Sequence, residues 1–314
     1  MYLGAENYLG PTAYLGAGGD PVTPAVPLGE IGVTVGGVTF YGSTALGDWT
    51  IKQEGLEGWF DGAPVRTDAP ERPGQHGQFG LPAYRDGRTV GLTVQCETRS
   101  DTDIGAARRV ITGILADGGY GTLTVVEPDG VITHGVVRLN GQPLVQTDGW
   151  RTVSAQLELW SPDPYRYGPL QQEYTTLPEL VGGLEFDLFT DGTVDTGTLE
   201  FGEQGSLGRV TLTNSGNAPG SPTFEVRGPA PQGFTIKHVE TGRRIVSATV
   251  IPAGSSLTSD TASGMATLDG VDRSGQLTVR EWPTIPPESS GTFAFTAPVH
   301  SAASLVAGIR PTNW

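Results

Sequence analysis

The sequence contains few of the residues that form reactive or metal-binding sites. One cysteine, Cys96, occurs among 314 residues, so no disulfide can form within the chain. Phosphate-binding glycine loops and a nucleophile with a correctly spaced base are missing. The histidines are scattered, and their spacing matches no set of zinc ligands: His76, His134, His238 and His300. We therefore predict no catalytic residues, no metal, no cofactor and no enzymatic activity.

Basic residues and long apolar runs are also scarce. The chain has 19 Lys and Arg against 34 Asp and Glu, a formal net charge of −15, and both halves are acidic. Such a surface repels nucleic acid, because phosphate binding needs clustered Lys and Arg. No apolar run approaches the roughly 20 residues that a membrane-spanning helix needs. We therefore expect a soluble protein or a component of an assembly, with no membrane insertion.

Glycine and proline, in contrast, are abundant. The 47 glycines and 24 prolines follow no collagen-like or linker repeat, which indicates many turns and hairpins and hence β structure. A chain of this length can form two domains, each with its own core. We predict an extended N-terminal arm and linker over residues 1–30, a first domain over 31–165 and a second domain over 166–314.

The N-terminus repeats the tripeptide Tyr-Leu-Gly, starting at Tyr2, Tyr8 and Tyr14. A six-residue spacing would scatter the tyrosines around a helix, and the glycines and Pro11 would weaken a helix further. In an extended chain the same spacing returns each tyrosine to one side. The segment therefore reads either as an extended arm with one aromatic edge or as a frayed terminus.

Alternating apolar residues predict strands in the first domain, most clearly "GRTVGLTVQCET" and "WRTVSAQLELWS". One helix is predicted in "SDTDIGAARRVITGILADGG", where an apolar stripe should face a sheet and Gly118-Gly119 should end the helix. Residues 56–80 show little periodicity, and a loop of this length is usually functional or disordered. His76 in this loop is the best catalytic candidate, but no supporting group is visible beside it.

Short strands at close spacing predict a β-sandwich in the second domain. Residues 167–208 hold eight carboxylates and no Lys or Arg. The spacing of Asp187, Asp191 and Asp195 does not match a known calcium loop, so a solvated acidic surface is the preferred reading. Aromatic residues such as Trp282 could stack on sugars, although core packing explains most of them equally well.

This order of elements, together with several motifs, resembles the distal tail protein family of long-tailed, non-contractile phages. The motifs are "RPGQHGQFG" in the long loop, "WSPDPYRYG" at the domain boundary, "TLTNSGNAPGSPTFEVRGP" in the sandwich and "WPTIPPESSGTFAF" near the end. The resemblance covers residues 31–314. The Tyr-Leu-Gly arm is not part of the usual family pattern.

The resemblance implies a mainly β fold. Its first domain would be a tail-tube-like β-sandwich or barrel with one packed α-helix, and its second a galectin-like or carbohydrate-module-like β-sandwich. It further implies a structural protein of the virion, a hub ring of six copies at the phage tail tip, assembled in the bacterial host cytoplasm. The ring would join the tail tube to the baseplate or fibres and line the DNA channel.

The same resemblance implies the partners. These are further copies of the chain, the tail-tube protein, the tape measure protein, and tail-tip, fibre or tail-associated lysin proteins. DNA would pass without specific binding, because carboxylates facing the channel would disfavour phosphate adhesion. We expect the N-terminal arm and the long loop to contact neighbouring subunits. The residues expected at this interface are Tyr2, Tyr8, Tyr14, Trp59, Phe60, Arg72, His76 and Phe79.

Three other readings stay open at this point. The second domain could itself bind carbohydrate, which would make the protein a receptor-binding adhesin. The chain could be a tail-tube subunit, which polymerises rather than stopping at one ring. An enzyme acting on the cell wall is the third, and the missing catalytic constellation argues against it.

Overall fold

The computed structural model describes residues 25–179, 184–185, 200–201 and 205–314, so the Tyr-Leu-Gly segment and half of the acidic stretch lie outside the described residues. The chain divides into two compact units. Unit 1 comprises Met1–Pro169 and Thr312–Trp314, and unit 2 comprises Leu170–Pro311. The expected boundary at 165/166 lies close to this division. The last three residues, which we assigned to the second domain, belong to unit 1 because they pair there as a strand.

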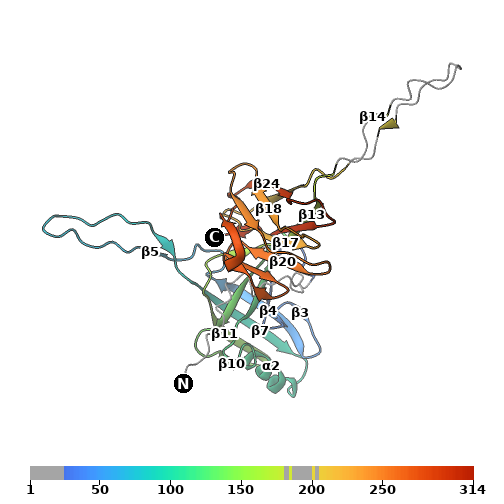
Figure 1. The fold of residues 1–314 in the computed structure, drawn as a ribbon. Coiled ribbons are helices and arrows are strands. Elements are labelled where there is room, and N and C mark those ends of the chain that lie inside the picture. The colour runs from blue at the N-terminus through green and yellow to red at the C-terminus, as the bar shows by residue number, and fades with distance from the viewer. Residues whose placement is uncertain (1–24, 180–183, 186–199, 202–204) are drawn as a thin grey trace, which may run out of the picture. The chain divides into compact units, whose positions relative to one another are not determined.

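Unit 1 is a curved antiparallel sheet in the order β2-β1-β8-β9-β11-β7-β4-β3, with β10 beside β11. Figure 1 labels β3, β4, β7, β10 and β11 of this sheet. β9 joins the two halves, since it pairs along its length with β8 but meets β11 only at Arg138 and Leu139. The strands are β1 (Gly32–Val35), β2 (Val38–Thr39), β3 (Gly42–Ser43), β4 (Gly47–Glu57), β7 (Arg88–Thr98), β8 (Gly121–Val126), β9 (Ile132–Leu139), β10 (Leu144–Asp148) and β11 (Thr152–Ser161). Two short strands, β12 (Arg166–Tyr167) and β26 (Thr312–Asn313), pair with each other, and β12 also pairs with β9.

The alternating pattern seen in the sequence forms the core of unit 1. Val90, Leu92, Val94 and Cys96 on β7 are buried, as are the apolar residues of β11 that lie opposite them. Side chains from β1 and β8 join the same cluster, so both halves of the sheet enclose one apolar interior. The predicted strands are therefore confirmed at these positions.

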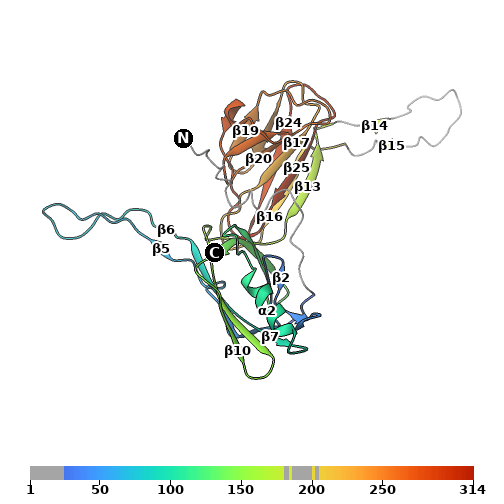
Figure 2. The same ribbon diagram turned by 90° about the horizontal axis from the view of Figure 1, so that it is seen from below.

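The predicted helix is present as α2 (Asp103–Thr112) and contacts β7, β10 and β11 (Figure 2). Ala107 and Ile111 are buried, which confirms the predicted apolar stripe. The predicted end at Gly118-Gly119 was wrong. The helix stops at Gly113, whose N–H donates to Arg109 O over 3.0 Å, and Ile114 then enters the core from the following turn.

Unit 2 is a sandwich of two antiparallel sheets, in the orders β13-β25-β17-β20-β21-β22 and β16-β24-β18-β19-β23. This confirms the predicted β-sandwich, and the mainly β fold holds for both units. The strands are β13 (Gln171–Thr176), β16 (Arg209–Asn214), β17 (Thr223–Arg227), β18 (Phe234–His238), β19 (Arg244–Ser247), β20 (Ser256–Asp260), β21 (Met265–Leu268), β22 (Val271–Asp272), β23 (Leu277–Arg280), β24 (Ser289–Thr296) and β25 (Ser304–Ile309). A further pair, β14 (Leu184–Glu185) and β15 (Glu200–Phe201), stands apart from both sheets.

Two features explain how unit 2 is held together. The rings of Phe224 on β17 and Phe293 on β24 meet edge to face at 4.9 Å, which joins the two sheets through the core. Asn214, in the motif "TLTNSGNAPG", is fully buried and donates from Nδ2 to Ala218 O at 2.7 Å and to Pro286 O at 3.2 Å. This motif residue therefore has a structural role inside the sandwich.

A buried histidine makes the stability of unit 2 depend on pH. His238 is 2% exposed, its ring stacks on Phe293 at 4.9 Å, and its Nδ1 lies 2.7 Å from Thr241 Oγ1. Burial lowers the pKa of His238, and the nearby Glu240 carboxylate only partly opposes this. The unfolded chain, with an ordinary histidine pKa of about 6.5, therefore takes up a proton before the folded chain does.

We predict that acidification destabilises unit 2 through His238. The stability that unit 2 gains by keeping this ring neutral is fully present above a pH of about 6.5. It is lost as the pH falls toward the lowered pKa of His238 in the folded state. In full-length protein followed by calorimetry, His238→Gln should flatten the fall in Tm between pH 7 and pH 5. His300→Asn, at an exposed position, is the control and should keep the wild-type slope. An unchanged slope in His238→Gln would contradict the assignment.

Candidate functional site: the projecting arm and its anchor

The long loop of unit 1 forms an arm, which we define as residues 62–86. Two short strands at its base, β5 (Val65–Arg66) and β6 (Tyr84–Arg85), pair antiparallel. The segment between them runs away from the sheet as a narrow hairpin (Figures 1 and 2). From residue 64 to residue 86 every side chain is exposed except the half-buried Ala69.

Backbone hydrogen bonds hold the two legs of the arm together. Asp86 N donates to Pro64 O at 2.7 Å, and Phe79 N donates to Pro70 O at 3.0 Å. Four prolines restrict the backbone further: Pro64, Pro70, Pro73 and Pro82. At about 3.3 Å per residue, a leg of about 11 residues reaches up to about 35 Å. This exceeds the radius of gyration of about 16 Å expected for a unit of this size, so the tip can contact another molecule.

The arm presents apolar side chains to solvent. Val65 is 57% exposed, Phe79 48%, Leu81 48% and Tyr84 64%. Arg72 lies over the Phe79 ring, with 5.4 Å between its guanidinium carbon and the ring centroid. Apolar residues gathered on a narrow projection have no core of their own to enter, and such exposure is typical of a surface that a protein partner covers.

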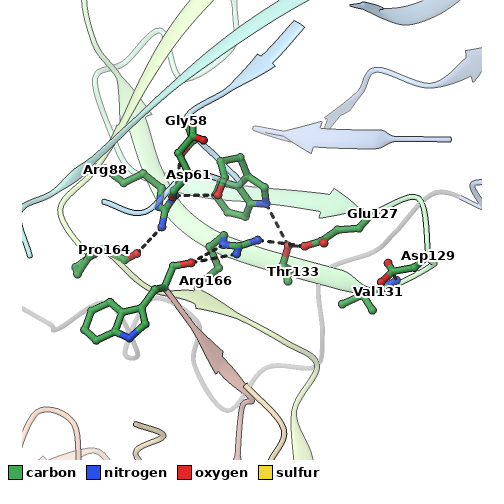
Figure 3. A network of polar contacts seen from close by, with 11 residues as sticks. Gly58, Asp61, Arg88, Glu127, Asp129, Val131, Thr133, Pro164 and Arg166 are labelled. Carbon is green, nitrogen blue, oxygen red and sulfur yellow. Dashed lines mark hydrogen bonds and ion pairs between the residues drawn. The ribbon is translucent and has the colours of Figure 1, made fainter. Parts of the chain in front are cut away.

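A buried arginine fixes the root of the arm (Figure 3). Arg88, at the start of β7, is 1% exposed, and its Nη1 donates to the carbonyls of Gly58, Trp59 and Asp61 at 2.7, 2.8 and 2.5 Å. Its Nη2 donates to Pro164 O at 3.0 Å. One guanidinium thus joins both chain segments at the root of the arm to the segment that leads into β12.

A second polar chain lies beside the first (Figure 3). Trp59 Nε1 donates to Thr133 Oγ1 at 3.2 Å, and Thr133 Oγ1 donates to Glu127 Oε1 at 2.9 Å. Arg166 Nη1 pairs with the same Glu127 oxygen at 3.2 Å. Both charged side chains are largely buried, so this pair is better shielded from water than a surface salt bridge.

The C-terminal segment of unit 1 covers the root from another side. Trp314 O accepts from Arg166 Nε at 3.2 Å and Nη2 at 3.0 Å, and the Trp314 ring lies 4.6 Å from the Tyr165 ring, tilted by 36°. Arg85, on the arm strand β6, lies 5.2 Å from the Trp314 ring and donates to Ala63 O at 2.6 Å. Residues from three distant parts of the sequence therefore define the direction in which the arm leaves the unit.

Burial shifts the pKa values of two groups at the root of the arm, Arg88 and Asp163, in opposite directions. It lowers the pKa of Arg88 to about 10, with the nearby Arg166 charge acting in the same direction, and the guanidinium still carries its proton at neutral pH. Burial raises the pKa of Asp163, although the Tyr167 hydroxyl donates to it at 2.6 Å and the Tyr165 N–H at 3.1 Å. The ionisable groups at the root of the arm are therefore largely shielded from water.

The predicted interface residues fall into three groups. Phe60, Arg72, His76 and Phe79 are exposed at the root or along the arm, as an interface requires. Trp59 is 1% exposed and packs in the core of its own unit, so a neighbouring subunit cannot reach it, and its place in the predicted interface is corrected to a structural one. Tyr2, Tyr8 and Tyr14 lie outside the described residues.

Sequence reasoning missed the residues that anchor the arm. Arg88 had a visible signal, because it occupies the same alternating face as Val90 and Leu92 and a charge in phase with buried residues needs buried partners. Arg166 and Trp314 gave no comparable signal, since 148 positions separate them and only the fold brings them together.

Within the described ranges, no group of three His, Cys, Asp or Glu side chains is arranged to hold a metal ion. In the same part of the chain, no helix is long and apolar enough to span a membrane. His76 is exposed near the tip of the arm.

Comparison with known proteins identifies the fold. No protein-family model matches the chain, and no curated protein matches its sequence. Among solved structures, the chain is similar to the crystal structure of SPP1 Dit (gp 19.1), described as a paradigm of the hub adsorption apparatus in phages that infect Gram-positive bacteria. The identity is 12%, the TM-score is 0.60, and the match covers 90% of this chain and 98% of that one. The two proteins therefore share a fold, which confirms the family resemblance at the level of structure.

Two further matches are chains of the phage P2 baseplate in its activated conformation, with Ca and with Sr. Their identities are 10% and 11%, each with a TM-score of 0.43, and each match covers 89% of this chain and 97% of that one. At this score the two matches do not define the fold, which rests on the SPP1 Dit comparison.

We predict that Arg88→Lys destabilises unit 1 by about 2 to 4 kcal/mol, because a lysine cannot serve four carbonyls from one planar fork and leaves buried acceptors without donors. Tryptophan fluorescence during urea unfolding measures this, since five of the six tryptophans lie in unit 1. Arg66→Lys, on the exposed strand β5, is the matched control and should change stability by less than about 0.5 kcal/mol. Equal stabilities for the two variants would show that Arg88 does not anchor the arm.

Proposed function

We propose that this chain is a structural protein of a phage tail tip, located in the virion, where copies of it form a hub ring. The shared fold with SPP1 Dit, a hub protein by its description, supports this role. The ring joins the tail tube on one side to baseplate or fibre proteins on the other. Its work is to hold other proteins in position, and the proposal includes no enzymatic activity.

The observation that carries the proposal is the arm. It is ordered by its own hydrogen bonds, fixed at its root by Arg88, and exposes Val65, Phe79, Leu81 and Tyr84. An arm that seats on a different surface of the next copy makes a head-to-tail contact, and repetition of that contact closes into a ring when the rotation permits. The arm of each subunit is thus the part that joins it to its neighbour.

Six copies, a central channel and passage of DNA belong to the proposal. The acidic balance of the chain suits such a channel, because carboxylates within about 8 to 10 Å of the duplex repel its phosphates. The proposed partners are other copies of this chain, the tail-tube and tape measure proteins, and fibre or lysin proteins of the tail tip. Assembly takes place in the cytoplasm of the bacterial host.

We predict that removing the apolar side chains of the arm prevents ring formation while each unit stays folded. The triple variant Phe79→Ser, Leu81→Ser and Tyr84→Ser should raise the protein concentration needed for assembly at least tenfold, because each lost apolar contact weakens every subunit junction. Mass photometry gives the copy number, and negative-stain electron microscopy separates rings from tubes and single particles.

The control is a double variant in unit 2, Val250→Ser and Val271→Ser, whose side chains are 57% and 56% exposed and lie outside the arm. It should assemble like the wild type. Assembly of the arm variant at the wild-type concentration would refute the role of the arm, wild-type particles without a ring would refute the hub, and long tubes would favour a tail-tube subunit.

A further inference from the structure

Unit 2 carries a surface cavity of about 490 Å³ at one end of the sheet formed by β18, β19 and β23. Its walls come from the turn between β18 and β19 and from the segment that follows β23. The lining residues are Thr241, Gly242, Arg243, Arg280, Glu281 and Trp282. The volume lies within the range of about 300 to 1,000 Å³ that is typical of small-molecule sites, although this cavity is wide open to solvent and more polar than most of them.

Hydrogen bonds hold the walls of this cavity in place. Gly242 N donates to His238 O at 2.9 Å, which closes the turn. Arg244 N donates to Glu281 Oε2 at 2.9 Å, and this fixes the Glu281 carboxylate. Arg280 Nε donates to Leu277 O at 3.3 Å. The turn and the Glu281 side of the cavity are therefore formed in advance, whereas the exposed Arg243 side chain becomes ordered only when a ligand binds.

The cavity concentrates positive charge in an acidic protein. Unit 2 has eight basic residues, and three of them, Arg243, Arg244 and Arg280, lie at this turn and the adjacent strand end. The Arg243 guanidinium makes no hydrogen bond or ion pair with the residues that the structure describes. Its donors are therefore available to a carboxylate or phosphate, which a guanidinium can bind through two parallel hydrogen bonds.

An indole completes the site. Trp282 is half-buried and packs against the apolar core of unit 2, while it also lines the cavity. An aromatic side chain that is fixed on one side and open on the other offers an apolar surface to a ligand. Beside it, Glu281 Oε1 can accept hydrogen bonds from hydroxyl groups, because only Oε2 is used by Arg244 N. Thr241 Oγ1 already bonds to His238 Nδ1 at 2.7 Å and accepts from Arg243 N at 3.4 Å, which leaves it one further position for a ligand hydroxyl.

We propose that this cavity binds an acidic saccharide, with Arg243 holding the anionic group, Glu281 and Thr241 holding ring hydroxyls, and Trp282 packing against the C–H face of the sugar. The combination of a free guanidinium, fixed acceptors and an indole matches each part of such a ligand. A bare anion would use only Arg243 and Arg280, and a neutral sugar would leave Arg243 without a partner. The site extends the proposed hub function and does not depend on ring formation.

The experiment uses the full chain and glucose 6-phosphate as the probe, followed by saturation-transfer NMR. Glucose is compared as the neutral sugar and inorganic phosphate as the bare anion, by competition. We expect glucose 6-phosphate to bind at least tenfold more tightly than either, since glucose lacks the anionic group and inorganic phosphate lacks the sugar ring. Arg243→Gln should weaken its binding about tenfold.

The matched control is Arg227→Gln, an exposed arginine of the same unit that pairs with Glu225 away from the cavity. It should bind like the wild type. No binding of glucose 6-phosphate, equal binding of inorganic phosphate, or an unchanged affinity in Arg243→Gln would each overturn the proposal. Because the assay reads single subunits and rings alike, these outcomes are separate from a failure of the hub proposal.

Discussion

The buried guanidinium of Arg88 is the interaction on which the arm depends. It gathers carbonyls from Gly58, Trp59, Asp61 and Pro164, segments that no sheet ladder joins. A buried guanidinium costs free energy unless carbonyl oxygens accept its hydrogen bonds, so any movement of these four carbonyls away from Arg88 is unfavourable. The arm therefore leaves unit 1 in one direction, although almost all of it lies in solvent.

The two units present two different kinds of surface. Unit 1 presents apolar residues on a narrow projection, which suits another copy of the chain. Unit 2 presents a small polar cavity with arginines and an indole, which suits a small ligand. The chain also returns from unit 2 to unit 1, where β26 pairs with β12 and Trp314 packs at the root of the arm. The last residues of the sequence thus pack against the root of the arm, which begins near residue 60.

Much of the fold followed from local pattern. Alternation on β7 and β11, and the apolar stripe of α2, determined which side chains enter the core, because burial of one face is a local property of a strand or helix. The helix end was misplaced because the apolar period continues through Ile114 after the helical backbone has stopped. Trp59 was misplaced for a related reason: an aromatic residue beside a long loop reads as exposed until its partner Thr133 is known.

The sequence by itself determined the β-rich class, the helix that begins near residue 103, the approximate division into two units and the existence of a long proline-rich loop, since each depends on neighbouring residues. Only the tertiary structure decided that the loop is an anchored arm and that Arg243 shares a cavity with Trp282. Both results join residues that lie far apart in the sequence. Arg88 and Trp59 are 29 positions apart, and Arg166 and Trp314 are 148 positions apart. Such contacts form when the fold brings distant segments together, and no local pattern contains them.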